Sequence, residues 1–147
     1  GTAGELCLQN GTGFVKKYEP VFKQFADFEY VAVLFFDCDG DGDLVLFIGS
    51  GGNNVQVPGR ELQHRLYKND GKGNFRIDTQ AFPNNDMNIS VAIAHDFDGD
   101  GFQDLFVGSR SVTYSYRVTP KSYLYKNDGH GHFTDVSSSM NPEIANI

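Results

Sequence analysis

An acidic loop that occurs twice, 59 residues apart, constrains the fold more than any other feature of the chain. The first copy reads DCDGDG at residues 37–42, and the second reads DFDGDG at residues 96–101. Carboxylates at every second position of a tight loop converge on one point, and glycine lets the backbone turn around that point. Each copy therefore predicts a site for a hard cation, and we expect calcium.

The repeat extends beyond the loops. Residues 37–50 align without gaps on residues 96–109, with 9 of 14 positions identical. A second block follows each loop, as LYKNDGKGNF at 66–75 and LYKNDGHGHF at 124–133, and a degenerate copy occupies residues 6–14. A period of 58 to 59 residues indicates an array of supersecondary units.

Short apolar runs flank each loop. Residues 30–36 and 44–48 enclose the first loop, and residues 90–94 and 105–107 enclose the second. These runs are rich in β-branched and aromatic residues, and no segment shows a clear helical periodicity. The pattern predicts strands that are buried on both faces.

The second block of each unit predicts a β-hairpin. Its Asn-Asp-Gly segment tolerates the positive φ angles of a tight turn, and Phe75 and Phe133 mark the return strands. Each unit is thus expected to be a four-stranded antiparallel sheet. Such sheets arranged radially form a β-propeller, so the predicted fold class is all-β with β-propeller-type blades.

Charge and composition exclude some function classes. The formal net charge is −7, and two bound divalent ions would reduce it to −3. An acidic chain without a basic footprint argues against nucleic-acid binding. No apolar run reaches the ~20 residues of a membrane span, and no signal peptide is recognised.

The two cysteines leave two alternatives open. Cys38 occupies the loop position where its counterpart is Phe97, so we expect a buried, packed thiol. A disulfide between Cys7 and Cys38 is the alternative.

The sequence resembles the FG-GAP/VCBS repeat family of β-propellers over nearly its whole length. The family pattern is D-x-[DN]-x-[DN]-G-x-x-D-L, followed by an apolar strand and a Tyr-x-Asn-Asp-Gly-x-Gly-x-Phe hairpin. The second loop fits fully, whereas in the first loop Val45 replaces the ninth-position Asp and Asp43 stands at position seven. An EF-hand is excluded, because its twelfth position needs Glu and holds Ile48 or Val107 here.

The resemblance implies a single repeat region over residues 1–147. Within it we expect a half blade at 5–20, a blade with the first loop at 30–80 and a blade with the second loop at 88–138. Because propellers close with 4–8 blades, we expect these two and a half blades to be a fragment of a larger propeller. The alternative is a short chain whose copies assemble through bare blade faces, as a homo-oligomer.

The expected site residues fall into two groups. One or two calcium ions are expected on ligands from both loops, namely Asp37, Asp39, Asp41, Asp43, Asp96, Asp98, Asp100, Asp104 and the carbonyl of Phe102. Glycan or protein contact is expected at an aromatic and basic segment that contains Tyr114, Tyr116 and Arg117.

We interpret the chain as a calcium-binding, non-catalytic module of an extracellular, periplasmic or cell-surface protein, for carbohydrate or protein binding and adhesion. The alternative is a scaffold fragment of a polysaccharide lyase or hydrolase. That class needs paired carboxylates or a Tyr, His or Lys base, and no such constellation stands outside the loops and turns, so we expect no catalytic residues.

Overall fold

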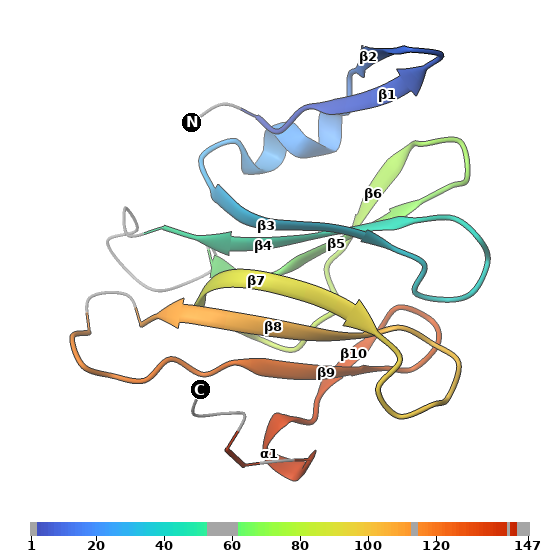
Figure 1. Ribbon diagram of the computed structural model, residues 1–147. Helices are drawn as coiled ribbons and strands as arrows, with labels where there is room; N and C mark the ends of the chain where they lie inside the picture. The colour runs from blue at the N-terminus through green and yellow to red at the C-terminus, as the bar shows by residue number, and fades with distance from the viewer. Residues whose placement is uncertain (1–2, 53–61, 113–114, 141, 144–147) are drawn as a thin grey trace.

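The computed structural model describes residues 3–52, 62–112, 115–140 and 142–143. They form one two-stranded sheet and two four-stranded sheets, in which neighbouring strands run antiparallel. The sheets are stacked in chain order (Figure 1). The prediction of an all-β chain with four-stranded antiparallel sheets is confirmed.

The chain begins with a hairpin and a short helix. Strands β1 (Leu6–Asn10) and β2 (Gly13–Lys17) pair across the turn of the degenerate third block. A 3-10 helix, η1 (Pro20–Phe25), follows, with its proline at the start, where a fixed φ and a missing N–H are tolerated. The sequence pattern did not predict this helix, nor the four-residue helix α1 (Ser137–Met140).

Each four-stranded sheet is a simple meander. The first contains β3 (Glu29–Phe36), β4 (Val45–Gly51), β5 (Arg65–Asn69) and β6 (Phe75–Asp78), in chain order. The second contains β7 (Asn88–His95), β8 (Asp104–Ser111), β9 (Tyr123–Asn127) and β10 (Phe133–Asp135), again in chain order. Each acidic loop therefore joins the first two strands of a sheet, and each Asn-Asp-Gly hairpin joins the last two, as predicted.

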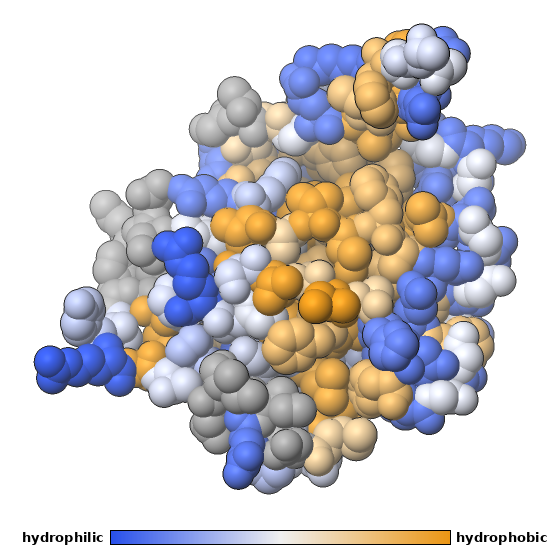
Figure 2. Space-filling model, in the orientation of Figure 1, coloured by the Kyte–Doolittle hydropathy of each residue, from blue (hydrophilic) through white to orange (hydrophobic). Residues whose placement is uncertain are grey.

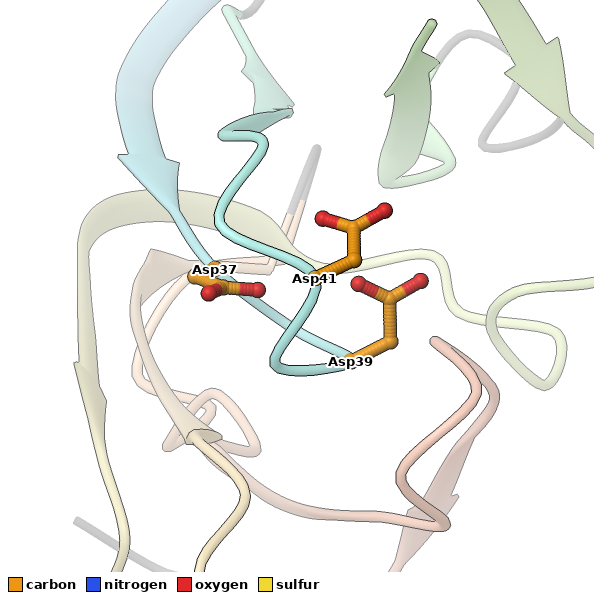
Figure 3. A group of neighbouring side chains, drawn as sticks. All are labelled: Asp37, Asp39 and Asp41. Atoms are coloured by element: carbon orange, nitrogen blue, oxygen red, sulfur yellow. The ribbon is translucent and has the colours of Figure 1, made fainter. Parts of the chain in front are cut away.

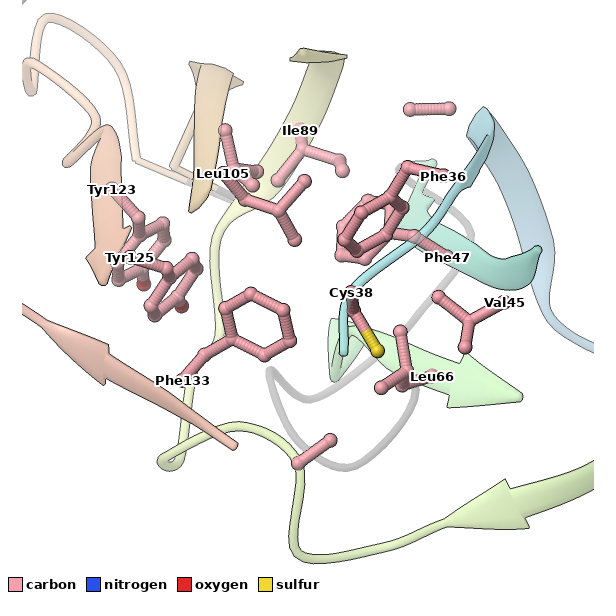
Figure 4. Close-up of a cluster of buried hydrophobic side chains, with 13 residues drawn as sticks. Phe36, Cys38, Val45, Phe47, Leu66, Ile89, Leu105, Tyr123, Tyr125 and Phe133 are labelled. Carbon is pink, nitrogen blue, oxygen red and sulfur yellow. The ribbon is translucent and has the colours of Figure 1, made fainter. Parts of the chain in front are cut away.

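The main core lies between the two four-stranded sheets (Figure 4). Phe36, Phe47 and Leu66 enter it from the first sheet, and Leu105 and Tyr125 enter it from the second. A smaller core lies between η1 and the other face of the first sheet. The central strands β4 and β5 of the first sheet are consequently covered on both faces, as the apolar run at residues 44–48 predicted for β4.

The prediction of burial on both faces is wrong for β3 and β7. These edge strands lie against each other, yet five of their apolar side chains stay exposed. We call them the apolar strip: Val31, Val33, Phe35, Val91 and Ile93. The strip is the hydrophobic area at the centre of Figure 2. Nothing in the described part of the chain buries these five side chains, which therefore alternate with less exposed ones along β3 and β7.

Cys7 is exposed, Cys38 is buried, and both are free thiols. Burial and the neighbouring Asp39 carboxylate raise the pKa of Cys38 to about 12, so its thiol is neutral and acts as a packing group. The expectation of a packed thiol is therefore confirmed. No helix among the described residues is long and apolar enough to cross a membrane.

Self-association through the apolar strip is a prediction that light scattering tests. Because exposed contiguous apolar side chains drive association, the wild-type chain should show a mass above that of a monomer at high concentration. Val33→Lys combined with Ile93→Lys should return it to a monomer. Val118→Lys is the control, since Val118 is 53% exposed, like Ile93 at 54%, but lies outside the strip. A wild-type chain that remains monomeric would contradict the prediction.

Candidate metal centre

The two acidic loops occupy equivalent places in the two four-stranded sheets. The first follows β3 and leads into β4, and the second follows β7 and leads into β8. Gly40 and Gly42 have φ angles of 74° and 87°, and Gly99 and Gly101 have 80° and 95°. These left-handed conformations, which favour glycine, turn each loop back so that its alternating carboxylates converge.

The first loop brings three carboxylates together, those of Asp37, Asp39 and Asp41 (Figure 3). Each offers an oxygen, and these oxygens lie within 4.8 Å of one another. Oxygens that bind one calcium ion at about 2.4 Å must lie within about 4.8 Å of each other, so the spacing fits the ion. The Asp37 carboxylate is held in place by the N–H groups of Gly40 and Gly42, at 2.8 and 3.1 Å.

Asp39 is the carboxylate of the first loop that most needs a cation. Its Oδ1 atom is buried and accepts no hydrogen bond. Burial, and then the nearby Asp41 carboxylate, raise the pKa of Asp39. A bound cation would supply the missing partner and favour the charged form.

The second loop brings together Asp96, Asp98 and Asp104, within the same 4.8 Å. The N–H groups of Gly99 and Gly101 hold Asp96 at 2.7 and 2.9 Å, which repeats the arrangement of the first loop. Asp104 is fully buried, and burial raises its pKa. It accepts hydrogen bonds from the N–H groups of Phe97 at 3.2 Å and Asn127 at 2.7 Å. Asp104 therefore links the loop to β9 as well as facing the other carboxylates.

Three expected ligands lie outside these two groups. The Asp43 side chain is directed at the backbone of Gly71, in the hairpin of the same sheet. The Phe102 ring packs in the same way on Gly129, and the role of its carbonyl stays a prediction. Asp100 contacts Lys126 at 3.2 Å. Position seven, which is Asp43 in the first loop and Phe102 in the second, thus carries a side chain that packs on the neighbouring hairpin.

Lys126 is a residue that the sequence pattern did not single out. Its ammonium group bonds to Asp98 and Asp100 at once. The N–H of Phe102, and then Lys126, hold the pKa of Asp100 below its usual value, while Asp98 raises the pKa of Lys126. The lysine is an internal counter-ion that a metal at the second loop must compete with or displace.

Asn127 is a second such residue, and it joins the two loops. Its side-chain amide donates to the carbonyl of Cys38 at 2.6 Å and to the carbonyl of Gln103 at 2.9 Å. It is fully buried. The sequence pattern indicated only a turn role for the asparagine of each hairpin block. The equivalent Asn69 has such a local role, since it accepts a bond from the N–H of Gly73 at 3.0 Å.

The expected ligand-contact segment is described in part. Tyr116 is 94% exposed. Among the described residues other than glycine, Arg117 is the one with a positive φ angle, at 62°. A backbone held in this region is strained, and such strain often accompanies a functional role. Tyr114 lies outside the described residues.

Comparison with known proteins gives one match. The family model described as an FG-GAP-like repeat matches residues 37–107, just under half of the chain. The match begins at the first residue of the first acidic loop and ends in β8, after the second loop. Searches of curated proteins and of solved structures found no match.

Packing of the second hairpin on the second loop can be measured with two glycine substitutions. Gly99 and Gly129 have φ angles of 80° and 79°, but a Cβ at Gly99 meets nothing within 4 Å, whereas at Gly129 it lies 2.7 Å from the Phe102 ring. Gly99→Ala should lower the free energy of unfolding by about 1–2 kcal/mol, the cost of the left-handed backbone. Gly129→Ala should lower it by a further ~1–3 kcal/mol, because the ring must move.

Urea unfolding in excess chelator measures both variants without interference from bound cations. Equal losses in the two variants would mean that the hairpin does not depend on the Phe102 contact.

Proposed function

We propose that the chain, whose residues 37–107 match an FG-GAP-like repeat, is a calcium-binding, non-catalytic module of the β-propeller type. The observation that carries the proposal is the pair of three-carboxylate groups at equivalent places in the two sheets. Two groups of like charge in register are costly unless a cation neutralises them. An all-oxygen set of carboxylates suits calcium, which accepts six to eight oxygen ligands in flexible geometry.

Calcium would act on structure in this proposal. Each ion would neutralise carboxylates that otherwise repel, and would fix the connection between the first two strands of a sheet. Asp37, Asp39 and Asp41 would hold the first ion, and Asp96, Asp98 and Asp104 the second. We propose Asp43, Asp100 and the Phe102 carbonyl as further ligands that would join after small rotations, with Lys126 released from Asp98.

We propose that the two four-stranded sheets are blades within one repeat region over residues 1–147, and that the β1–β2 hairpin belongs to a further, partial blade. The sheet order and the stacking in Figure 1 support this arrangement. The exposed apolar strip supports it as well, because further blades or a second copy of the chain would cover it.

We place the module outside the cytoplasm, at a cell surface or in the periplasm or extracellular medium. Loops of this kind bind calcium with modest affinity, which suits the millimolar calcium found there. Tyr116 and Arg117, together with Tyr114, are proposed to contact a glycan or protein ligand, since exposed aromatic and guanidinium groups stack on sugars and anchor partners.

Removing calcium should destabilise the protein. For a dissociation constant of about 0.1 mM and about 2 mM free calcium, one site contributes ~1.8 kcal/mol to the free energy of unfolding. Excess chelator should therefore lower the melting temperature by about 4–7 °C for each occupied site in a chain of this size. A melting curve that is identical in chelator and in millimolar calcium would show that the loops are ordinary turns.

Single substitutions assign the ions to the loops. Calorimetry should show two ions on the wild type, with the second loop tighter because Val45 of the first loop stands where the second has the buried carboxylate of Asp104. Asp39→Ala should remove the weaker ion and Asp98→Ala the tighter one. Glu5→Ala is the control, because Glu5 is an exposed acid outside both loops. Uptake that both loop variants leave unchanged would place the ions elsewhere.

A glycan array tests the proposed ligand contact. The wild-type chain in millimolar calcium should retain a defined set of glycans, and Tyr116→Ala should lose at least about tenfold of that signal, as removal of a stacking anchor does. Tyr18→Ala is the matched control, since Tyr18 is also exposed, at 66%. Equal retention by the two variants would exclude Tyr116 as the contact.

A further inference from the structure

A buried arginine marks a place where the two units differ. Arg65 stands at the start of β5, where the equivalent residue of the second unit is Tyr123. Its side chain is only 4% exposed. A charge that is removed from water needs a partner, so a buried arginine in place of an aromatic residue calls for a specific reason.

The environment of Arg65 compensates only part of its charge. The guanidinium lies over the rings of Phe25, Phe28 and Tyr30, at 4.7, 5.0 and 4.9 Å from their centroids. Its Nη2 donates to the hydroxyl of Ser50 at 2.6 Å. The aromatic faces attract the cation, but they supply no acceptor for the remaining N–H groups.

Three buried donors on this face lack an acceptor in the described structure. Two are the Nε and Nη1 groups of Arg65, and the third is the hydroxyl of Tyr67. Arg65 and Tyr67 are two residues apart on β5, so both point to the same face of the sheet. Burial raises the pKa of Tyr67 to about 12, against the effect of Arg65, so this hydroxyl keeps its proton and remains a donor.

Arg65 lines a pocket of about 560 Å³. This volume lies within the ~300–1,000 Å³ of small-molecule sites. Phe25, Ile77 and Phe82 supply apolar wall, and His64 lines the pocket as well. Burial lowers the pKa of His64 to about 3, so at neutral pH it adds no charge.

Among the described residues, the charged groups around the pocket leave one cation in excess. Asp78 is the acidic residue of the pocket wall, and it is paired with Lys68 at 3.1 Å. The groups that favour the charged form of Arg65 are Tyr67 and Tyr30, which are phenols and not carboxylates. A ligand with one negative charge would balance Arg65, whereas a dianion would leave a buried charge of the opposite sign.

We propose that this pocket binds a small organic molecule through a carboxylate group, which accepts hydrogen bonds from Arg65 while the rest of the molecule lies against the apolar wall. Charge-assisted hydrogen bonds from a guanidinium to a carboxylate are among the strongest in proteins. The site is separate from the acidic loops, and it does not depend on calcium binding there.

Benzoate is the probe, because it combines a carboxylate with an apolar ring. Its neutral isostere benzamide is the matched ligand control, and inorganic phosphate tests a dianion. The readout is the ¹⁵N–¹H signal of Arg65 Nε, recorded for the whole chain in millimolar calcium. Benzoate should shift this signal saturably, and benzamide and phosphate should bind at least tenfold more weakly. A shift of equal size with phosphate, or none with benzoate, would overturn the proposal.

Variants confirm the donors. Arg65→Met should abolish saturable benzoate binding, whereas Arg76→Met, at an exposed arginine of β6, should leave it unchanged. Arg65→Lys keeps the positive charge but loses the planar guanidinium fork and should weaken binding at least about tenfold, which keeps the test decisive if Arg65→Met does not fold. Wild-type affinity in Arg65→Lys would overturn the proposal. Calcium calorimetry on the same samples reports separately on the loops.

Discussion

The amide of Asn127 is the contact on which the arrangement of the two sheets depends. It lies at the end of β9, yet it donates to the carbonyl of Cys38 in the first acidic loop and to that of Gln103 in the second. The bond to Cys38 is buried and the bond to Gln103 is partly buried, so loss of the former would leave polar groups without partners in the core, at a cost of about 1–3 kcal/mol. One side chain therefore ties the backbones of the two acidic loops to each other.

The two loops differ in the positive charge that lies near their crowded carboxylates. In the second loop Lys126 already supplies a positive charge, which it shares between Asp98 and Asp100. In the first loop the equivalent Lys68 is paired with Asp78 instead, and Asp39 keeps a buried oxygen without a partner. Each loop carries four carboxylates, but the second has the buried Asp104 at position nine and Lys126 as a built-in competitor. Carboxylate number alone is therefore an incomplete guide to the relative affinity of the two sites.

Much of the fold could be predicted because its determinants are local. The acidic loops, the Asn-Asp-Gly turns and the apolar runs each repeat, and each specifies its own backbone conformation. The exposure of β3 and β7 could not be predicted in this way, because it depends on what packs over an edge strand. The roles of Arg65 and Asn127 could not be predicted either, because they depend on contacts with residues far away in the sequence. The mismatch between Arg65 and Tyr123 in otherwise matching blocks was nevertheless a usable signal.

The lysine contacts between successive layers make the stack directional. Lys17 of β2 donates to the carbonyl of Gly73 at 2.5 Å, in the hairpin of the next sheet, and Lys68 of β5 donates to the carbonyl of His130 at 2.9 Å, in the hairpin of the sheet after that. The first four-stranded sheet thus receives an ammonium group at its hairpin and extends one to the next hairpin, whereas the equivalent Lys126 of the second sheet bonds to Asp98 and Asp100 within its own sheet. A unit of this kind is not interchangeable end for end, because a reversed unit would bring two ammonium groups, or two turn carbonyls, to the same junction.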